Sequence, residues 1–338
     1  MRARSRELRQ NVRETMKTVP CAAAILAFAL AAAPTEKISE RDAVRIREFY
    51  RLADKIQNEV WPGWGATPAP VLLVTSTSEF LTHHPQPPEE FVDAGDGFVV
   101  RPRQFPPNLE ATFPAFGPPS VIVVGTPETT ASRASTPWLF VLMHEHFHQL
   151  QDRQPEFYKK VEGLGLSHGD TSGMWMLNYP FPYEKPEAVQ GFLALRDLLL
   201  KALAQQDDTK FKELAGEYEK QRKAYFAQFS VDDRKYFEFE LWKEGIARYT
   251  QVKCAEVAER YEPTPEFAAL PDYESFAAVG GKARAATLSE LHQIKLSEAK
   301  RLVVYPFGAA EGFLLDRLKP DWKKHYFEHL FTLDGFFK

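Results

Sequence analysis

More than any other feature, the segment Val141–Gln149, VLMHEHFHQ, limits how this chain can fold. It contains His144, Glu145 and His148 in an H-E-x-x-H arrangement, directly after the apolar residues 140–143. An apolar run of this kind predicts a helix that is buried rather than exposed. Burying His-Glu-His without partners is costly, so we expect the fold to provide a ligand for these side chains.

His144 and His148 are suited to bind one metal ion together. Residues four apart lie on one face of a helix, where two imidazoles can bind one zinc ion at about 2.0–2.1 Å each. Glu145 lies one position further round, where it can reach a water at the metal without ligating the metal. A surface helix with incidental histidines is the alternative. The apolar surroundings and the predicted helix start at Thr136 and Pro137 argue against it and favour one Zn2+ per chain.

A third protein ligand must come from elsewhere, because catalytic zinc sites usually have three protein ligands and a water. Positions 151 and 154 are both glutamine, which excludes the metzincin extension of the motif. The best candidate is Glu244 in FELWKEGIARYT, where the small residues Gly245 and Ala247 would let a second helix approach the zinc helix. The competing candidate is Asp170, in a predicted loop after the zinc helix.

His144-Glu145-x-x-His148 followed by Glu244-Gly-Ile-Ala resembles the gluzincin metallopeptidases of the peptidase MA clan. These combine H-E-x-x-H with a downstream glutamate on a second helix, often in an E-G-x-A setting. The resemblance covers mainly residues 136–152 and 237–251, and the predicted helices at 188–229 would be an insertion. It implies that His144, His148 and Glu244 are the zinc ligands and that Glu145 is the general base.

A donor for the developing oxyanion is also required if hydrolysis passes through a tetrahedral intermediate. Gluzincins often supply a tyrosine or histidine some distance after the third ligand. Tyr305 is our first choice, because Pro306 suits a first helical position and would place Tyr305 at a helix N-terminus. The alternative is a core tyrosine with a satisfied hydroxyl, and Tyr249 and His292 are further candidates.

The N-terminal residues 1–33 read as a signal peptide. The uncharged run CAAAILAFALAAA at 21–33 follows basic residues, ends in small residues and is too short to span a bilayer comfortably. We expect cleavage near Ala31 or Ala33, with translation starting at Met1 or Met16. The mature protein would then be secreted or periplasmic, without stable membrane insertion.

Charge and cysteine content narrow the possible functions. Without residues 1–33, which hold six Lys/Arg and two Asp/Glu, the 42 basic and 46 acidic residues become 36 and 44. A formal charge of −8 without a basic patch excludes nucleic acid as an expected partner. Only Cys254 would remain, so no intramolecular disulfide is possible.

Hydrophobic periodicity predicts an α+β fold of the zincin kind. We expect a small mixed-sheet N-terminal lobe at 34–135 and a larger helical C-terminal lobe at 136–338, with the active site in the cleft between them. The predicted strands are 71–74, 98–101 and 121–124, a helix begins within 75–81, and 102–119 is an extended surface segment. The predicted helices are 39–62, 136–152, 188–206, 209–229, 231–258, 282–302, 306–318 and 321–331, with a long loop at 165–187.

These features together predict a secreted zinc metallopeptidase that cleaves a peptide or protein substrate. A zinc-dependent hydrolase of a non-protein amide or ester is a second hypothesis. A zinc-stabilised binding protein without turnover is a third, although only catalysis requires the intact Glu145. The cleavage preference and the oligomeric state do not follow from the sequence.

Overall fold

A six-stranded mixed sheet occupies the first part of the computed structural model, which describes residues 36–337. Its strands follow the order β3-β4-β2-β1-β6-β5, in which β1 and β6 are parallel and every other pair is antiparallel. The bounds are β1 Val71–Val74, β2 Ser78–Thr82, β3 Val92–Gly95, β4 Phe98–Pro102, β5 Glu110–Phe113 and β6 Val121–Gly125. The predicted signal peptide lies outside the described residues.

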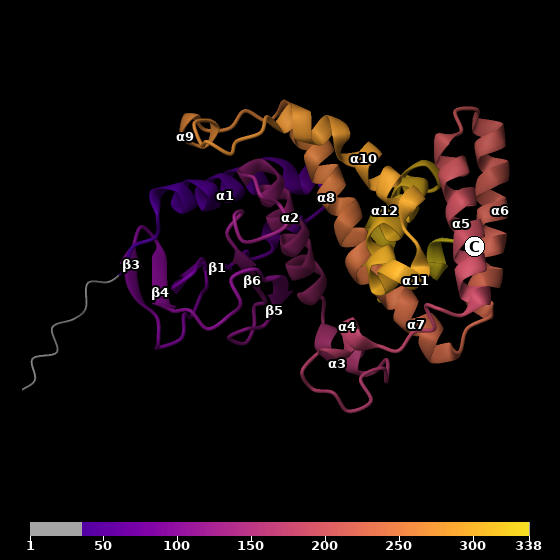
Figure 1. Ribbon diagram of the computed structural model, residues 1–338, viewed down its shortest axis with the longest axis horizontal. Helices are drawn as coiled ribbons and strands as arrows, with labels where there is room; N and C mark the ends of the chain where they lie inside the picture. The colour runs from indigo at the N-terminus through magenta and orange to yellow at the C-terminus, as the bar shows by residue number, and fades with distance from the viewer. Residues whose placement is uncertain (1–35, 338) are drawn as a thin grey trace, which may run out of the picture. The chain divides into compact units, whose positions relative to one another are not determined.

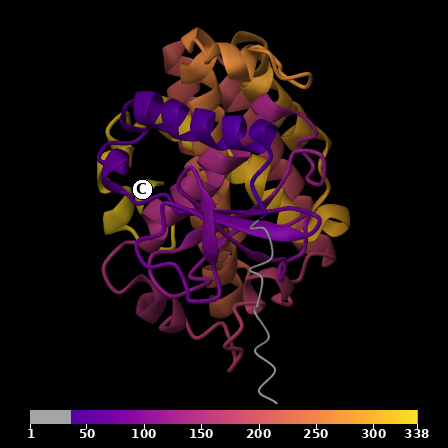
Figure 2. The ribbon, with the colours of Figure 1, turned by 90° about the vertical axis from the view of Figure 1, so that its left-hand side faces the viewer.

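The two faces of the sheet are covered differently. Helices α1 (Glu40–Val60) and α2 (Ser135–Asp152) pack on the face that carries Leu73 and Val124. The opposite face, with Leu72 and Val123, is covered by aromatic side chains from the proline-rich segment 103–119. Alternating side chains of β1 therefore enter two separate hydrophobic clusters, as the twofold period of a strand requires. Figure 2 shows α1 running across the sheet.

Several predicted elements are confirmed. Ser39 caps α1, because its hydroxyl oxygen accepts a hydrogen bond from the backbone N–H of Asp42 at 3.1 Å. The mixed sheet, the α+β composition and a helix that ends at Asp152 also agree with the prediction. Thr136 does not cap that helix, however. Its hydroxyl donates to the backbone carbonyl of Glu274 at 2.6 Å, which anchors the helix start to a distant segment.

Two predictions for the N-terminal half were wrong. Residues 78–82 form β2 instead of a helix, because they pair with β1 on one side and β4 on the other, and this pairing outweighs local preference. The segment 102–119 contains the edge strand β5, which pairs with β6. All four residues of β5 are only partly buried, so no alternating burial marks it in the sequence.

The secondary-structure elements that follow β6 are all helical. The long helices are α5 Pro186–Ala204, α6 Asp208–Ala227, α7 Val231–Glu240, α8 Ile246–Val257, α10 Phe276–Gln293 and α12 Val304–Leu318. The short helices are α3 Phe157–Glu162, α4 Trp175–Asn178, α9 Pro265–Ala268, α11 Leu296–Ala299 and α13 Trp322–His325. The helix predicted at 282–302 ends at Gln293, because Ile294 is extended. In place of the helix predicted at 321–331, the structure has the short α13 and a 3-10 turn.

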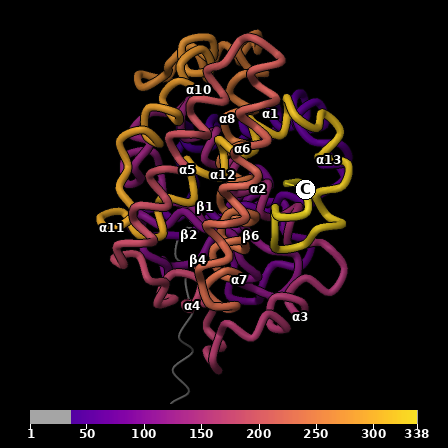
Figure 3. The backbone as a smooth tube through the Cα atoms, turned by 90° about the vertical axis from the view of Figure 1, so that its right-hand side faces the viewer, coloured from indigo at the N-terminus to yellow at the C-terminus, as the bar shows by residue number. Residues whose placement is uncertain are grey.

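The helices are layered behind α2. Helix α2 packs on α8, α8 on α12, and α12 on α5, which pairs with α6 (Figure 1). Figure 3, from the side opposite the sheet, shows α5 and α6 in front of α12. Helix α2 therefore lies between the sheet and the helical half. Among residues 36–337, no helix combines the length and apolar character needed to cross a membrane.

Candidate metal centre

Three side chains from α2 and the α7–α8 junction converge on one point. The Nε2 atoms of His144 and His148 are 3.2 Å apart, and Oε2 of Glu244 lies 3.5 Å and 3.3 Å from them, respectively. Ligand atoms placed tetrahedrally at 2.0–2.1 Å from zinc are separated by about 3.3–3.4 Å. The structure thus brings together the three predicted ligands, at a spacing that fits one zinc ion.

Glu244 is positioned by an irregular turn. A π-helical turn, Leu241–Gly245, interrupts the predicted continuous helix between α7 and α8. Such turns are rare and are often found at functional sites. A Cβ atom on Gly245 would lie 2.7 Å from Cα of Gly308, so this glycine allows close contact with α12. The prediction that Gly245 gives clearance toward the zinc helix is therefore wrong.

Arg301 supports the third ligand, and no sequence pattern identified it. Its Nη2 donates to Oε1 of Glu244 at 3.0 Å, and its Nε lies 2.7 Å from Oε2 of the buried Glu240. Burial alone would raise the pKa of Glu244, but the nearby His148 and His144 imidazoles and Arg301 guanidinium hold it well below its usual value. The Oε2 atom is therefore an anionic group directed at the two histidines.

Gln151 fixes the orientation of His148. Nδ1 of His148 lies 2.7 Å from Oε1 of Gln151, while the amide nitrogen of Gln151 donates to the backbone carbonyls of Trp242 and Lys243. Because the amide nitrogen is committed as a donor, its oxygen accepts the Nδ1–H of His148, which leaves Nε2 unprotonated for a metal. Burial lowers the pKa of His144, and this also favours a neutral imidazole.

Glu145 lies beside the three ligands. One of its carboxylate oxygens and one nitrogen from each of His144 and His148 lie within 4.8 Å of one another. The hydroxyl of Thr112, on β5, is 2.8 Å from Oε2 of Glu145. Burial raises the pKa of Glu145 to about 7, with His144 opposing the shift and Glu244 adding to it. A carboxyl with such a pKa can accept and return a proton near neutral pH.

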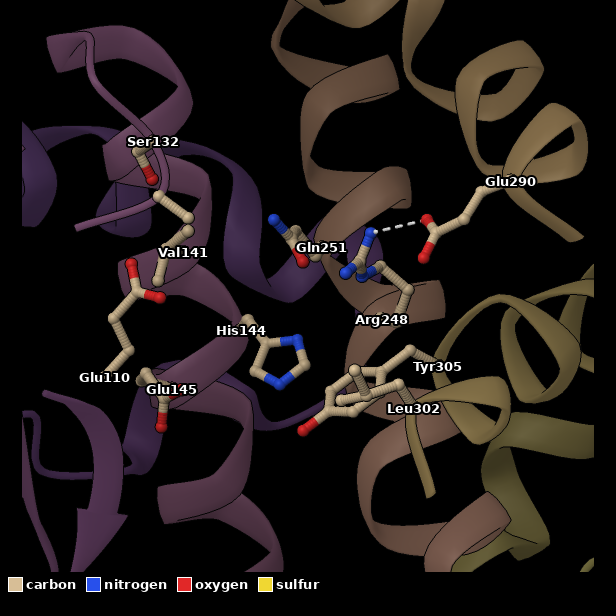
Figure 4. Close-up of a pocket in the computed structure, with 11 residues that line it drawn as sticks. Glu110, Ser132, Val141, His144, Glu145, Arg248, Gln251, Glu290, Leu302 and Tyr305 are labelled. Atoms are coloured by element: carbon tan, nitrogen blue, oxygen red, sulfur yellow. Dashed lines mark hydrogen bonds and ion pairs between the residues drawn. The ribbon is translucent and has the colours of Figure 1, made fainter. Parts of the chain in front are cut away.

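Tyr305 lies against the other side of His144. The two rings are stacked with centroids 6.1 Å apart, and Figure 4 shows Glu145 and Tyr305 on opposite sides of the imidazole. The Tyr305 hydroxyl accepts a hydrogen bond from Arg301 at 3.1 Å. Within residues 36–337 it donates none, so its own proton is available to a substrate oxygen. Helix α12 begins at Val304, which places Tyr305 in the first turn.

The other candidates are engaged elsewhere. Tyr249 donates to Asp316 at 2.7 Å, and His292 is exposed on α10. The Asp170 carboxylate accepts hydrogen bonds within its own loop, including one from the backbone N–H of Trp175 at 2.7 Å. His146 points away from the metal centre and stacks on Trp64, in agreement with a structural role.

A cavity of about 450 Å³ adjoins the metal centre on the side of the N-terminal end of α2. Side chains from β5, α2, α8, α10 and the start of α12 line it, together with residues 131 and 132. Figure 4 shows the labelled lining residues. His144, Glu145 and Tyr305 all contribute to its wall. The cavity is large enough to hold one amino-acid residue.

The comparisons with known proteins give no match: no protein-family model fits the chain, and neither a curated protein nor a solved structure is significantly similar to it.

Proposed function

We propose that this protein is a zinc-dependent, gluzincin-like metallopeptidase. His144, His148 and Glu244 would hold the zinc ion, and Glu145 would act as the general base. The observation that carries this proposal is the triangle of ligand atoms, 3.2–3.5 Å on each side, with an unligated carboxylate beside it. The apolar N-terminal run in the sequence supports secretion or a periplasmic location.

The residues around the triangle account for the steps of hydrolysis. Zinc, when bound, lowers the pKa of a coordinated water to about 7 and polarises a carbonyl. Glu145 accepts the proton of the attacking water and passes it to the leaving amine. Tyr305 donates a hydrogen bond from its free hydroxyl to the developing oxyanion, and Arg301 holds that hydroxyl in place.

The sheet edge favours a peptide over another amide or ester. β5 is the last strand of the sheet, and Thr112 from this strand contacts Glu145 directly. No further strand within residues 36–337 pairs with its outer edge. An extended peptide can add to such an edge through backbone hydrogen bonds. The scissile bond would then lie between the sheet edge and the helical half, as in a zincin-like cleft.

The test is the substitution Glu145→Gln in zinc-reconstituted protein, assayed with a broad peptide library. We expect wild-type protein to cleave peptides and to carry about one zinc per chain by elemental analysis. Glu145→Gln should retain the zinc, and its activity should fall by about 10²–10⁴-fold, because the substitution removes the base but no ligand. The matched control is Glu156→Gln, an exposed glutamate just after α2.

Two results would contradict the proposal. One is near-wild-type turnover by Glu145→Gln, which would remove the assigned base. The other is protein that takes up no zinc on reconstitution, which would remove the metal centre itself.

A further inference from the structure

The cavity beside the metal centre contains polar atoms that the protein leaves unpaired. Oε1 of Glu110 and Nε of Arg248 are buried without a hydrogen-bond partner in residues 36–337, and so is Nδ1 of His144. All three residues line this cavity. A buried polar group without a partner is costly and rare in native proteins, so this cluster indicates a place where a polar ligand binds.

The charges lining the cavity determine the sign of that ligand. Nη1 of Arg248 lies 3.4 Å from Oε2 of Glu290, so the guanidinium already has a carboxylate of its own. Glu110 has no such ion pair among the described residues. Oε1 of Glu110 is thus the carboxylate atom of this cavity that lacks a partner, whereas the Arg248 guanidinium, apart from its Nε, is held by Glu290. A cationic donor would satisfy Oε1 and, because burial raises the pKa of Glu110, would also favour the charged form of this carboxyl.

Glu110 is also placed where a substrate must pass. It lies on β5 two residues before Thr112, and residues at this spacing project from the same face of a strand. Figure 4 shows Glu110 on the α2 side of the cavity, with Arg248 and Gln251 across from it. A group bound to Glu110 would thus belong to the substrate residue next to the bond that the water activated by Glu145 attacks.

We infer that this cavity is a specificity subsite for a positively charged group, an ammonium or a guanidinium, which donates hydrogen bonds to Oε1 of Glu110. The inference rests on the proposed function, because the ligand is a cationic part of the peptide substrate. Two sources share this chemistry: the α-ammonium of a peptide N-terminus and the side chain of a lysine or arginine. A charge-assisted hydrogen bond supplies the recognition in either case.

Binding measured without turnover tests the subsite separately from catalysis. The zinc-loaded Glu145→Gln protein is titrated by calorimetry with four peptides of equal length. The first has uncharged side chains and a free N-terminus, and the second is its N-acetylated form. The third and the fourth are N-acetylated and carry one lysine and one glutamate, respectively. We expect a cationic peptide to bind about 10–100-fold more tightly than the acetylated neutral one. Preference for the first peptide identifies the N-terminal ammonium, and preference for the third identifies a side chain.

Substitutions assign the preference to one residue. Adding Glu110→Gln should abolish the preference for the cationic peptide, whereas Glu110→Asp, which keeps the charge, should retain part of it. Glu290→Gln, which alters the paired carboxylate instead, should leave it largely intact. Thermal unfolding of each variant shows whether the protein remains folded.

Equal affinity for cationic and neutral peptides would overturn the subsite, as would the absence of binding by both cationic peptides. Tighter binding of the glutamate peptide, lost in Arg248→Gln, would also overturn it and would make Arg248 the anchor. None of these results bears on zinc-dependent hydrolysis by wild-type protein. Conversely, an inactive wild-type protein that still prefers cationic peptides would remove the proposed function and leave the binding site.

Discussion

Two buried clusters of the helical half have the same composition and different surroundings. Each consists of one arginine, two glutamates and one tyrosine: Arg301 with Glu240, Glu244 and Tyr305, and Arg222 with Glu238, Glu311 and Tyr218. The closest ion pairs are similar, at 2.7 Å for Arg301 with Glu240 and 2.6 Å for Arg222 with Glu311. Composition and ion-pair distance therefore do not distinguish a functional cluster from a structural one.

The difference lies in what the remaining atoms contact. Tyr218 donates its hydroxyl proton to Glu311, and the rings of Phe226 and Phe337 cover Arg222 at 4.7 Å and 4.6 Å. That cluster is closed and ties α6 to α7, α12 and the C-terminal segment. In the Arg301 cluster, the second oxygen of Glu244 faces two histidines and the Tyr305 proton is free. In the proposed function, these open positions of the Arg301 cluster are the ones that meet the metal and the substrate.

The largest contrast should come from one glutamate of each cluster. Glu244→Ala removes a ligand and should weaken zinc binding by more than about 100-fold, beyond the effect of changing a residue that only supports a ligand. Glu238→Ala should leave zinc affinity unchanged but lower the free energy of unfolding by about 1–3 kcal/mol, because Arg222 loses one of its two buried carboxylate partners and keeps Glu311. Zinc titration and urea unfolding measure the two effects. Asp170→Ala should change neither, and loss of zinc in that variant would transfer the ligand role to Asp170.

The tyrosines of the two clusters should differ in their effect on catalysis. Tyr305→Phe removes the proposed oxyanion donor and should lower kcat by about 10²–10³-fold with little change in stability. Tyr218→Phe removes one of the two hydrogen bonds to Oε1 of the buried Glu311, the other being from Arg222, and should cost about 1–3 kcal/mol of stability without changing kcat. Peptide cleavage rates and thermal unfolding distinguish the two. If Tyr305→Phe retains full kcat, this hydroxyl plays no part in the reaction.

The arginines should give the smallest effect on the metal. Arg301→Gln loosens Glu244 without removing it, so zinc affinity should fall by about 10–100-fold. Arg222→Gln should act on stability alone, provided that the measurement is made at a temperature where the variant is folded. Equal zinc affinities for the two variants would show that the clusters are not functionally different.

The sequence predicted the residues that depend on local spacing. His144 and His148 share a helix face because they are four residues apart, and Glu244 was identified by its E-G-x-A setting. Thr112 and Arg301 had no local signature, because their contacts depend on sheet pairing and on packing between distant helices. From the sequence, we likewise expected Gly245 to face the helix of His144 and His148, whereas in the structure Gly245 faces Gly308 on α12.

The prediction of the strands from the sequence was limited in the same way. Strands with strongly apolar residues, such as 71–74 and 121–124, were identified correctly because burial on both faces leaves a clear signal. β5 was missed because partial burial gives it no alternation, and prolines surround it. One of the strands that the sequence analysis missed is thus the strand that contacts Glu145 and carries Glu110.

Because of the π-helical turn at Leu241–Gly245, the site is more sensitive to the insertion or deletion of a residue than to substitutions at neighbouring surface positions. Each residue advances an α-helix by about 100°, so the wider turn resets the angular phase between α7 and α8. Removing one residue there would rotate either Glu240 away from Arg301 or the whole of α8 away from its partners. Substitutions at neighbouring surface positions leave that phase untouched. Apart from the substitution of Glu244 itself, single-residue insertions and deletions in this segment would be the changes most damaging to the candidate metal centre.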